Sequence, residues 1–404
     1  MLILVFMEKI KMTFKVKSSE LLFAFAYYPW ILAWILTATF YKDFLSPYAF
    51  INIWQYVGLI FLFIKLILES NKISYLLLSI LMGIIGIIIT IGNGNASFVA
   101  YSIFLILSSR TIEFDNLVRN TMICQLVIVF MTVLGAIFNI LPNLVETSVA
   151  TTFIRTRYSL GFTYSTFLPN FFTSIVLEYA YLKKRMKWTI TELIIVGGFN
   201  FIIYQYTQTR TGYILVWGIL LVFLWDRIKG IDFSKTILRG VYIGIYILSA
   251  LLALILTIKY SPNNPFLNSL NVILSQRLRF GQLGLQTYPV TLFGTNIKWE
   301  SSSSSYFYID SSYINMLISY GVVLFAIILI SYSYLIWRLV QYKEFVSLVI
   351  VLIFWALRAI IDPQLFLLWH NPFLFLLLGS NLLDKINMDR ESKKHEDNVL
   401  FTVN

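Results

Sequence analysis

The sequence predicts an all-α polytopic integral membrane protein with about twelve transmembrane helices. Three observations support this class: 58% of the 404 residues are hydrophobic, only 13% are charged, and long apolar runs recur throughout the chain. Soluble globular domains contain about 25% charged residues. A mean hydropathy of +0.78 therefore excludes an ordinary soluble domain.

A bilayer core about 30 Å thick requires roughly 20 apolar residues in each spanning helix. Runs near this length, bounded by charged residues, Gly, Pro or Asn, give the predicted spans. These spans are 21–40, 50–68, 74–92, 96–109, 119–140, 166–182, 189–207, 212–226, 237–258, 312–336, 344–361 and 364–382. The chain 1–404 then forms a single membrane domain.

The basic residues predict the orientation of these spans. With the N-terminus in the cytoplasm, about 22 of the 31 basic residues fall on the cytoplasmic side, which is the positive-inside pattern. An even number of spans also places the tail 383–404 in the cytoplasm. The net charge of +11 is then explained by orientation, and it predicts no nucleic-acid partner because the basic residues are scattered singly.

Few other motifs are present. The single cysteine, Cys124, cannot form an internal disulfide. The sequence contains no P-loop, no GxGxxG fingerprint and no His/Cys metal cluster, so we expect neither a cofactor nor a metal.

Two long connections are predicted outside the membrane: 141–165, and the larger 259–311 between the ninth and tenth spans. The first contains "FIRTRYSLGFTYSTF", and between the two loops Arg210 begins the eighth span in "YTQTRTGY". Outside arginines oppose the orientation rule, so they need a wet or anionic partner. Lipid headgroups, or outside carboxylates such as Glu146 and Glu300, offer one explanation, and an anionic substrate offers another.

The larger loop is expected to contain an amphipathic helix on the membrane surface, because apolar residues recur at three- and four-residue spacing over 266–280. On such a helix Arg277 and Arg279 point in nearly opposite directions. Arg277 shares its side with Gly281 and Gly284, which leaves room for a bulky anion and ranks Arg277 above Arg279. The alternative is that the glycines only end the helix.

The order of several short motifs resembles the Wzy-type repeat-unit polymerases of bacterial capsule, exopolysaccharide and O-antigen. The resemblance covers roughly 150–325. The motifs are "RYSLGF" with Gly161, "QTRTG", "SQRL", "LFG" with Gly294, and "IDSSYINMLISYG". One departure is that Thr163, Tyr164 and Ser165 stand where such proteins often have His-Pro-Asn, which puts a histidine role at this loop in doubt.

The resemblance implies a membrane glycosyltransferase in the cytoplasmic (plasma) membrane of a bacterium. Its substrates would be polyprenyl-diphosphate-linked oligosaccharides, and its partners would include the flippase and chain-length regulator of a polysaccharide assembly system. Arg157, Arg210 and Arg277 would bind the diphosphate that leaves, since guanidinium groups bind phosphate oxygens in a bidentate manner. Arg279 is the weaker fourth candidate.

A general base would activate the attacking sugar hydroxyl, and two residues are candidates. Asp310 follows the arginine loop, but Asp310 and the following Ser311 both favour the alternative role of N-cap of the next helix. His370 lies inside the last predicted span. Its expected role there is either catalysis or a hydrogen bond to a neighbouring helix. Arg358 and Asp362 are four residues apart and fit an intrahelical ion pair. Asp43 is a lone outside carboxylate and not the paired carboxylate motif of metal-dependent lipid-linked glycosyltransferases. We therefore expect glycosyl transfer that needs no metal ion.

Two related functions remain open. A glycan ligase of the same superfamily would share the arginines, and a flippase or transporter can also have twelve spans.

The serine run 301–305 predicts a flexible loop tip. Aromatic residues of the large loop have two alternative expected roles: to stack on sugar rings or to anchor the loop at the membrane interface. They are Trp299, Tyr306, Phe307 and Tyr308.

Overall fold

The computed structural model describes residues 2–69, 73–94, 97–150, 153–184, 188–233, 238–299 and 307–377, without the side chains of 2–17, 148–150, 153–155 and 343. The predicted tail 383–404 and the serine run 301–305 lie outside the described residues.

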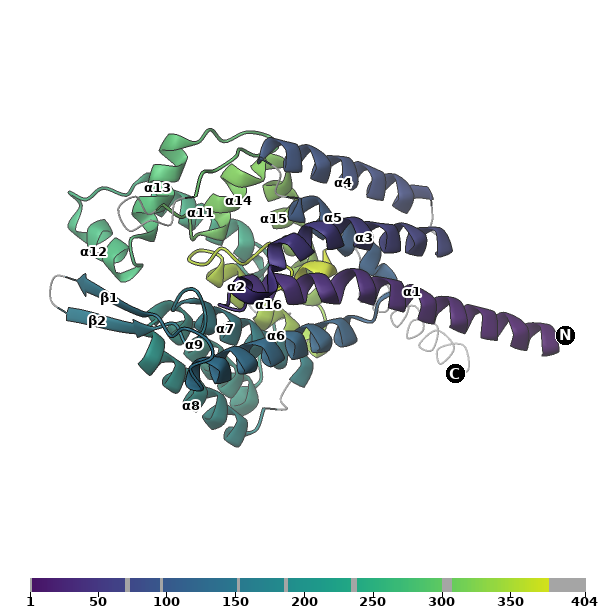
Figure 1. The fold of residues 1–404 in the computed structure, drawn as a ribbon, viewed down its shortest axis with the longest axis horizontal. Coiled ribbons are helices and arrows are strands. Elements are labelled where there is room, and N and C mark those ends of the chain that lie inside the picture. Colours follow the sequence, from purple (N-terminus) through teal and green to yellow (C-terminus); the bar gives the residue numbers. More distant parts are fainter. Residues whose placement is uncertain are drawn as a thin grey trace, which may run out of the picture.

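Within these residues the chain is a bundle of helices with one β-hairpin (Figure 1). The α-helices are α1 (Leu2–Thr37), α2 (Lys42–Leu45), α3 (Pro47–Leu68), α4 (Ile73–Gly92), α5 (Phe98–Ser108), α6 (Phe114–Ile137), α7 (Phe167–Lys183), α8 (Ile190–Thr207), α9 (Arg210–Lys229), α10 (Arg239–Ile243), α11 (Ile245–Ile258), α12 (Pro265–Ile273), α13 (Arg277–Thr287), α14 (Ser312–Ser319), α15 (Gly321–Leu339) and α16 (Val346–Arg358). Three short 3-10 helices are η1 (Ser109–Thr111), η2 (Lys343–Phe345) and η3 (Pro372–Leu376). The strands β1 (Val145–Ala150) and β2 (Phe153–Tyr158) pair antiparallel.

The helical membrane class is confirmed by the apolar helices. Six helices among the described residues are long and apolar enough to cross a membrane, and three shorter apolar helices accompany them. The six are α1 from Ser18, α3, α4, α6, α9 and α15, and the shorter ones are Phe98–Thr111, α11 and α16. The count of twelve spans and the orientation stay predictions.

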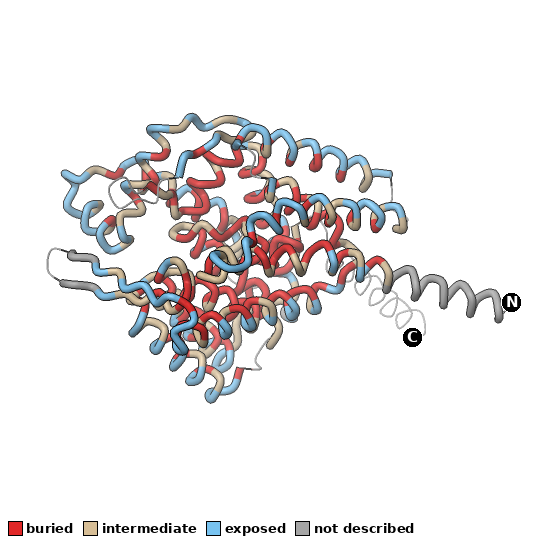
Figure 2. The backbone as a smooth tube through the Cα atoms, viewed as in Figure 1, coloured by how far each residue is buried: buried red, intermediate tan, exposed pale blue. Residues whose placement is uncertain are grey.

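Burial also fits a lipid environment. Large apolar side chains on the outer helices are exposed, such as Ile53, Phe63 and Ile67 on α3, while the buried residues gather in the centre (Figure 2). Exposed apolar surface of this extent is rare on soluble monomers. Lipid tails would cover these side chains in a multi-pass membrane protein.

Two predicted segments are interrupted at backbone with positive φ, and a third, 237–258, is divided into α10 and α11 at Gly244, whose φ is −84°. The predicted span 312–336 is two helices, because Gly321 has a φ of 83° between α14 and α15. The predicted amphipathic helix 266–280 is also wrong as one element: α12 and α13 are separated at Ser275 and Gln276, with φ of 55° and 68°. Left-handed backbone cannot continue a right-handed helix.

The final predicted span, 364–382, is not a regular helix in its described part. Turns run to Asn371, and the 3-10 helix η3 follows at Pro372. Proline disfavours helical backbone in the residue before it, and Asn371 accordingly has φ −126° and ψ 82°. The Asn371 amide donates to Tyr332 Oη at 3.1 Å and to Leu365 O at 2.8 Å, which anchors this segment in the interior.

The hairpin and the α12–α13 segment gather at one end of the bundle, opposite the N-terminal end of α1 (Figure 1). We refer to this end, made of β1, β2, α12 and α13, as the loop end. The two loops predicted outside the membrane, 141–165 and the described part of 259–311, therefore lie at the same end of the molecule.

A close contact in the loop 291–295 provides a test of the packing. Gly294 has a φ of 96°, and a Cβ there would collide with Ser319 O at the end of α14. We expect Gly294→Ala to reduce the free energy of unfolding by about 1–3 kcal/mol, from backbone strain alone, and the collision adds to this. The check is the thermal midpoint in detergent against Gly198→Ala, whose added Cβ meets nothing within 4 Å. Equal midpoints for the two variants would contradict the packing.

Candidate diphosphate and glycan site at the loop end

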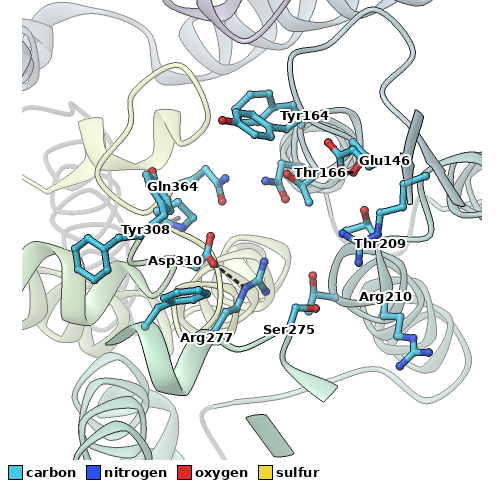
Figure 3. A pocket seen from close by; sticks show the side chains of 18 of the residues that line it. Glu146, Tyr164, Thr166, Thr209, Arg210, Ser275, Arg277, Tyr308, Asp310 and Gln364 are labelled. Carbon is cyan, nitrogen blue, oxygen red and sulfur yellow. Dashed lines mark hydrogen bonds and ion pairs between the residues drawn. The ribbon is translucent and has the colours of Figure 1, made fainter. Parts of the chain in front are cut away.

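A cavity of about 610 Å³ opens at the loop end and brings together segments that are distant in the sequence (Figure 3). It is lined by Glu146, Arg157, Tyr164, Ser165, Thr166, Phe167, Asn170, Thr209, Arg210, Thr211, Ser275, Arg277, Phe280, Trp299, Phe307, Tyr308, Asp310, Pro363 and Gln364. We call it the arginine cavity. Three arginines predicted to bind the diphosphate and the candidate base Asp310 all line it.

The hairpin and the turn after it position Arg157. Glu146 lies opposite Arg157 in the strand register, and its carboxylate accepts a hydrogen bond from Ser165 Oγ at 2.9 Å. The turn is tied to the start of the hairpin, because the Leu144 N–H donates to Ser159 Oγ at 2.8 Å. Gly161 has a φ of 85° and packs against Thr132 O, where a Cβ would lie at 2.6 Å. The "RYSLGF" segment is therefore a turn that holds β2 against the bundle.

A tight turn between α8 and α9 positions Arg210. Gln208 is left-handed with a φ of 49°, Thr209 is buried, and α9 begins at Arg210. Gly212 packs on Pro169 of α7, with 3.2 Å between a hypothetical Cβ and Pro169 Cβ. The side chain of Arg210 is exposed and points away from Arg277 and Asp310 in Figure 3. Arg210 therefore borders the arginine cavity at its rim.

Arg277 begins α13 and is held between two carboxylates. Its Nε lies 3.4 Å from Asp310 Oδ2, and its Nη2 lies 3.3 Å from Asp362 Oδ1. The side chain of Arg277 is only 11% exposed and that of Asp362 only 3%. The two neighbouring carboxylates offset much of the positive charge of Arg277. This guanidinium is therefore better placed to position Asp310 than to bind a diphosphate by itself.

The structure excludes the N-cap role considered for Asp310, while its role as a base stays a prediction. Ser311 occupies the N-cap position of α14, while the Asp310 carboxylate pairs with Arg277 (Figure 3). Burial is the largest influence on the pKa of Asp310 and raises it; Arg277 opposes this shift, and the Asp362 carboxylate adds to it. A raised pKa brings a carboxylate closer to the basicity that proton abstraction requires.

Asp362 joins this site to the bundle interior. The predicted ion pair with Arg358 is present, with Arg358 Nε 3.4 Å from Asp362 Oδ2. It is not intrahelical, because α16 ends at Arg358 and Asp362 follows the turn after it. Arg358 is buried and also donates to Ser174 Oγ and Asn170 O, each at 2.9 Å. The contact between Asp362 and Arg277 was not predictable from the sequence, because it joins segments about 85 residues apart and depends on their packing.

The start of α14 sets this geometry. The Ser312 N–H donates to Ala359 O at 2.9 Å, and the Ser312 hydroxyl donates to Asp362 O while accepting from the Leu365 N–H at 3.1 Å. These bonds hold the segment after α16 against the "IDSS" motif. As a result the carboxylates of Asp310 and Asp362 both reach Arg277.

Three predicted site residues on α13 lie outside the described lining of the arginine cavity. Arg279 is exposed, consistent with its opposite direction from Arg277. Gly281 and Gly284 are buried: a Cβ at Gly281 would lie 3.0 Å from Thr257 Cγ2, and one at Gly284 would collide with Ile309. The room expected beside Arg277 is thus occupied by protein, and these glycines allow α13 to pack closely.

His370 is buried outside the described lining of the arginine cavity. Its ring stacks on Phe171 with centroids 4.2 Å apart, and its Nδ1 lies 3.5 Å from Ser174 Oγ. These contacts correspond to the alternative of bonding a neighbouring helix, here α7. Because it does not face the cavity, we assign His370 to packing and retain Asp310 as the candidate base.

The arginine cavity is suited to an anion carrying a polar group. Three arginines line it together with two carboxylates, and it also receives the first turn of α9, where backbone amides favour negative charge. The described residues contain no group of three or more His, Cys, Asp or Glu side chains suited to a metal ion. Metal independence stays a prediction.

Together the fold and the site define a multi-pass helical membrane protein with a cationic cavity at one end. Comparison with models of known protein families, with curated protein sequences and with solved structures gives no match. The functional assignment therefore rests on the residues of the chain.

Proposed function

We propose that this protein joins polyprenyl-diphosphate-linked oligosaccharide repeat units into a surface polysaccharide at the outer face of the cytoplasmic membrane. The observation that carries the proposal is the convergence of Arg157, Arg210 and Arg277 with Asp310 on one cavity. These residues come from the motifs by which the sequence resembles the repeat-unit polymerases.

In the proposed reaction a sugar hydroxyl of one unit transfers its proton to Asp310 and attacks the anomeric carbon of a second unit. The bond from that carbon to the lipid diphosphate breaks, and the electron pair leaves with the diphosphate. Arg157, together with Arg210 at the rim of the cavity, stabilises the charge that develops on it. Each charged hydrogen bond contributes about 1.5–3 kcal/mol.

Arg277 acts in this scheme by positioning Asp310. Its guanidinium bridges Asp310 and Asp362, two groups that would otherwise repel each other. Lysine has no planar fork and cannot reproduce both contacts.

We therefore expect Arg277→Lys to lower the polymerisation rate by about tenfold or more, and Arg279→Ala to have a much smaller effect because Arg279 is exposed. Polymer length and yield in cells expressing equal amounts of each variant provide the measurement. Full activity of Arg277→Lys, or a greater loss in Arg279→Ala, would reverse the assignment.

The first test is deletion of the gene in its own host, with surface and lipid-linked glycans separated by size. A surface glycan limited to one repeat unit, or accumulation of single lipid-linked units, supports the polymerase. Long polymer that remains on the lipid carrier would indicate a ligase. Polymer formation that is unaffected would contradict both assignments.

A further inference from the structure

A second cavity, of about 420 Å³, adjoins the arginine cavity. Trp299, Tyr308 and Pro363 line both cavities and form the wall between them. The remaining lining residues are Trp34, Asn93, Gly94, Phe98, Thr295, Asn296, Ile297, Asn315, Ser319, Tyr320, Leu367 and Trp369. We call it the amide cavity.

Close glycine contacts build one side of the amide cavity. A Cβ at Gly92 would lie 3.1 Å from Phe293 O, and one at Gly94 would collide with the side chain of Asn296. The Thr295 N–H donates to Ile318 O at 2.9 Å on the other side. The segment around Asn296 is therefore held between the end of α4 and the end of α14.

The lining differs in kind from that of the arginine cavity. Among the described residues that line the amide cavity, none carries a charge. It has three asparagines, and the Asn315 amide donates to Ile309 O at 3.2 Å and accepts from Ser319 Oγ at 3.1 Å. A primary amide has two donor hydrogens and two acceptor positions, so among the described contacts Asn315 retains one of each.

Indole groups complete the lining. Trp34 and Trp369 stack with centroids 4.4 Å apart and an interplanar angle of 2°. The Trp34 Nε1–H is buried and has no hydrogen-bond partner within the described part of the chain. Because this nitrogen is inaccessible from the cavity, Trp34 contributes apolar ring surface to the lining and no hydrogen-bond donor.

From this lining we propose that the amide cavity binds an uncharged sugar ring of a lipid-linked oligosaccharide. Aromatic faces stack on the apolar C–H surface of a sugar, while amides and hydroxyls bond its hydroxyl groups. A diphosphate would meet no cation in the described lining, and a polyprenyl chain would leave the amides unsatisfied. This inference rests on the proposed function and adds a site that selects the glycan.

The shared wall couples the two sites. Tyr308 lies two residues before Asp310, and the rings of Tyr308 and Trp299 are 4.8 Å apart. A sugar held in the amide cavity against this wall can direct a neighbouring ring toward Asp310. The amide cavity thus supplies the selection and orientation of the glycan, and the arginine cavity supplies the stabilisation of charge.

The test uses the full-length chain in detergent and two probes that separate the cavities. One probe is the repeat-unit oligosaccharide of the host, released from its lipid, and the other is geranyl diphosphate. Binding is followed by tryptophan fluorescence, since Trp34, Trp299 and Trp369 line the amide cavity. The variant is Asn296→Phe, because Asn296 is exposed at the cavity and a phenyl ring there fills the space. Asn268→Phe, at an exposed site on α12 outside both linings, is the matched control.

We expect Asn296→Phe to weaken oligosaccharide binding at least tenfold, with geranyl diphosphate binding within twofold of the unmodified protein and no change in Asn268→Phe. Unchanged oligosaccharide affinity in Asn296→Phe overturns the inference. If the unmodified protein binds geranyl diphosphate but no oligosaccharide, the amide cavity is not a sugar site while the proposed function stands. If it binds neither probe, both proposals are overturned.

Discussion

Replacing Asp310 by asparagine should reduce the rate of glycan joining by about 10²–10⁴-fold, which is the usual contribution of a general base. Asparagine has nearly the same shape and can still contact Arg277, but it cannot accept a proton from the attacking hydroxyl. The measurement is the initial rate of polymer formation from lipid-linked units by the purified protein. Binding of geranyl diphosphate should change little, because Asp310 does not hold the leaving group in the proposed reaction.

The matched control is Asp43→Asn. Asp43 is an exposed carboxylate on α2 that lies outside the described lining of both cavities. We expect its rate to equal that of the unmodified protein. A rate for Asp310→Asn within a few-fold of this control would eliminate Asp310 as the base and require another proton acceptor.

The rate should also depend on pH through Asp310. Burial raises the pKa of Asp310 above its ordinary value of 3.8. A base acts in its ionised form, so the rate falls as the pH drops through this raised pKa, and the acid limb lies above pH 3.8. A pH profile that retains the same acid limb in Asp310→Asn would assign the limb to another group.

The second large effect is expected at Arg157. Arg157→Lys keeps the positive charge but loses the fork that binds two phosphate oxygens. Loss of one charged hydrogen bond, worth about 1.5–3 kcal/mol, corresponds to a decrease of about 10–100-fold in kcat/KM. The same variant should bind geranyl diphosphate more weakly, whereas Asn296→Phe should not.

Arg239→Lys is the control for this substitution, because Arg239 begins α10 and lines neither cavity in the described residues. We expect it to retain full activity. If Arg157→Lys retains the kcat/KM of this control, then the positive charge alone is sufficient and the bidentate contact is absent.

The amino-acid composition of individual segments was sufficient to predict the membrane class and most helices. Apolar composition and run length are properties of each segment, so α3, α4, α6 and α9 lie close to spans predicted from the sequence. The Arg358–Asp362 pair was predictable from its spacing of four residues. The helix expected to carry both residues ends at Arg358. The outside arginines were noticeable because they break the orientation rule.

Backbone conformation limited the prediction of the larger loop and the last spans. The spacing of apolar residues over 266–280 suggested one helix. This spacing carries no information on backbone φ, so the left-handed conformations of Ser275 and Gln276 were not predicted. These residues turn α13 so that Arg277 enters the arginine cavity. The apolar run 364–382 was likewise predicted as a spanning helix from its composition. In the structure, Pro372 and the buried amide of Asn371 favour turns in its described part.

By itself, the sequence determined a helical membrane chain and the arginines that depart from its charge pattern, because hydropathy and charge belong to short segments. Only the tertiary structure decided that Arg157, Arg210 and Arg277 share one cavity, that Asp362 pairs with Arg277, and that the amide cavity exists. Each of these features needs segments far apart in the chain to pack at specific distances. Their positions depend on turns, glycine contacts and buried hydrogen bonds that no single segment contains.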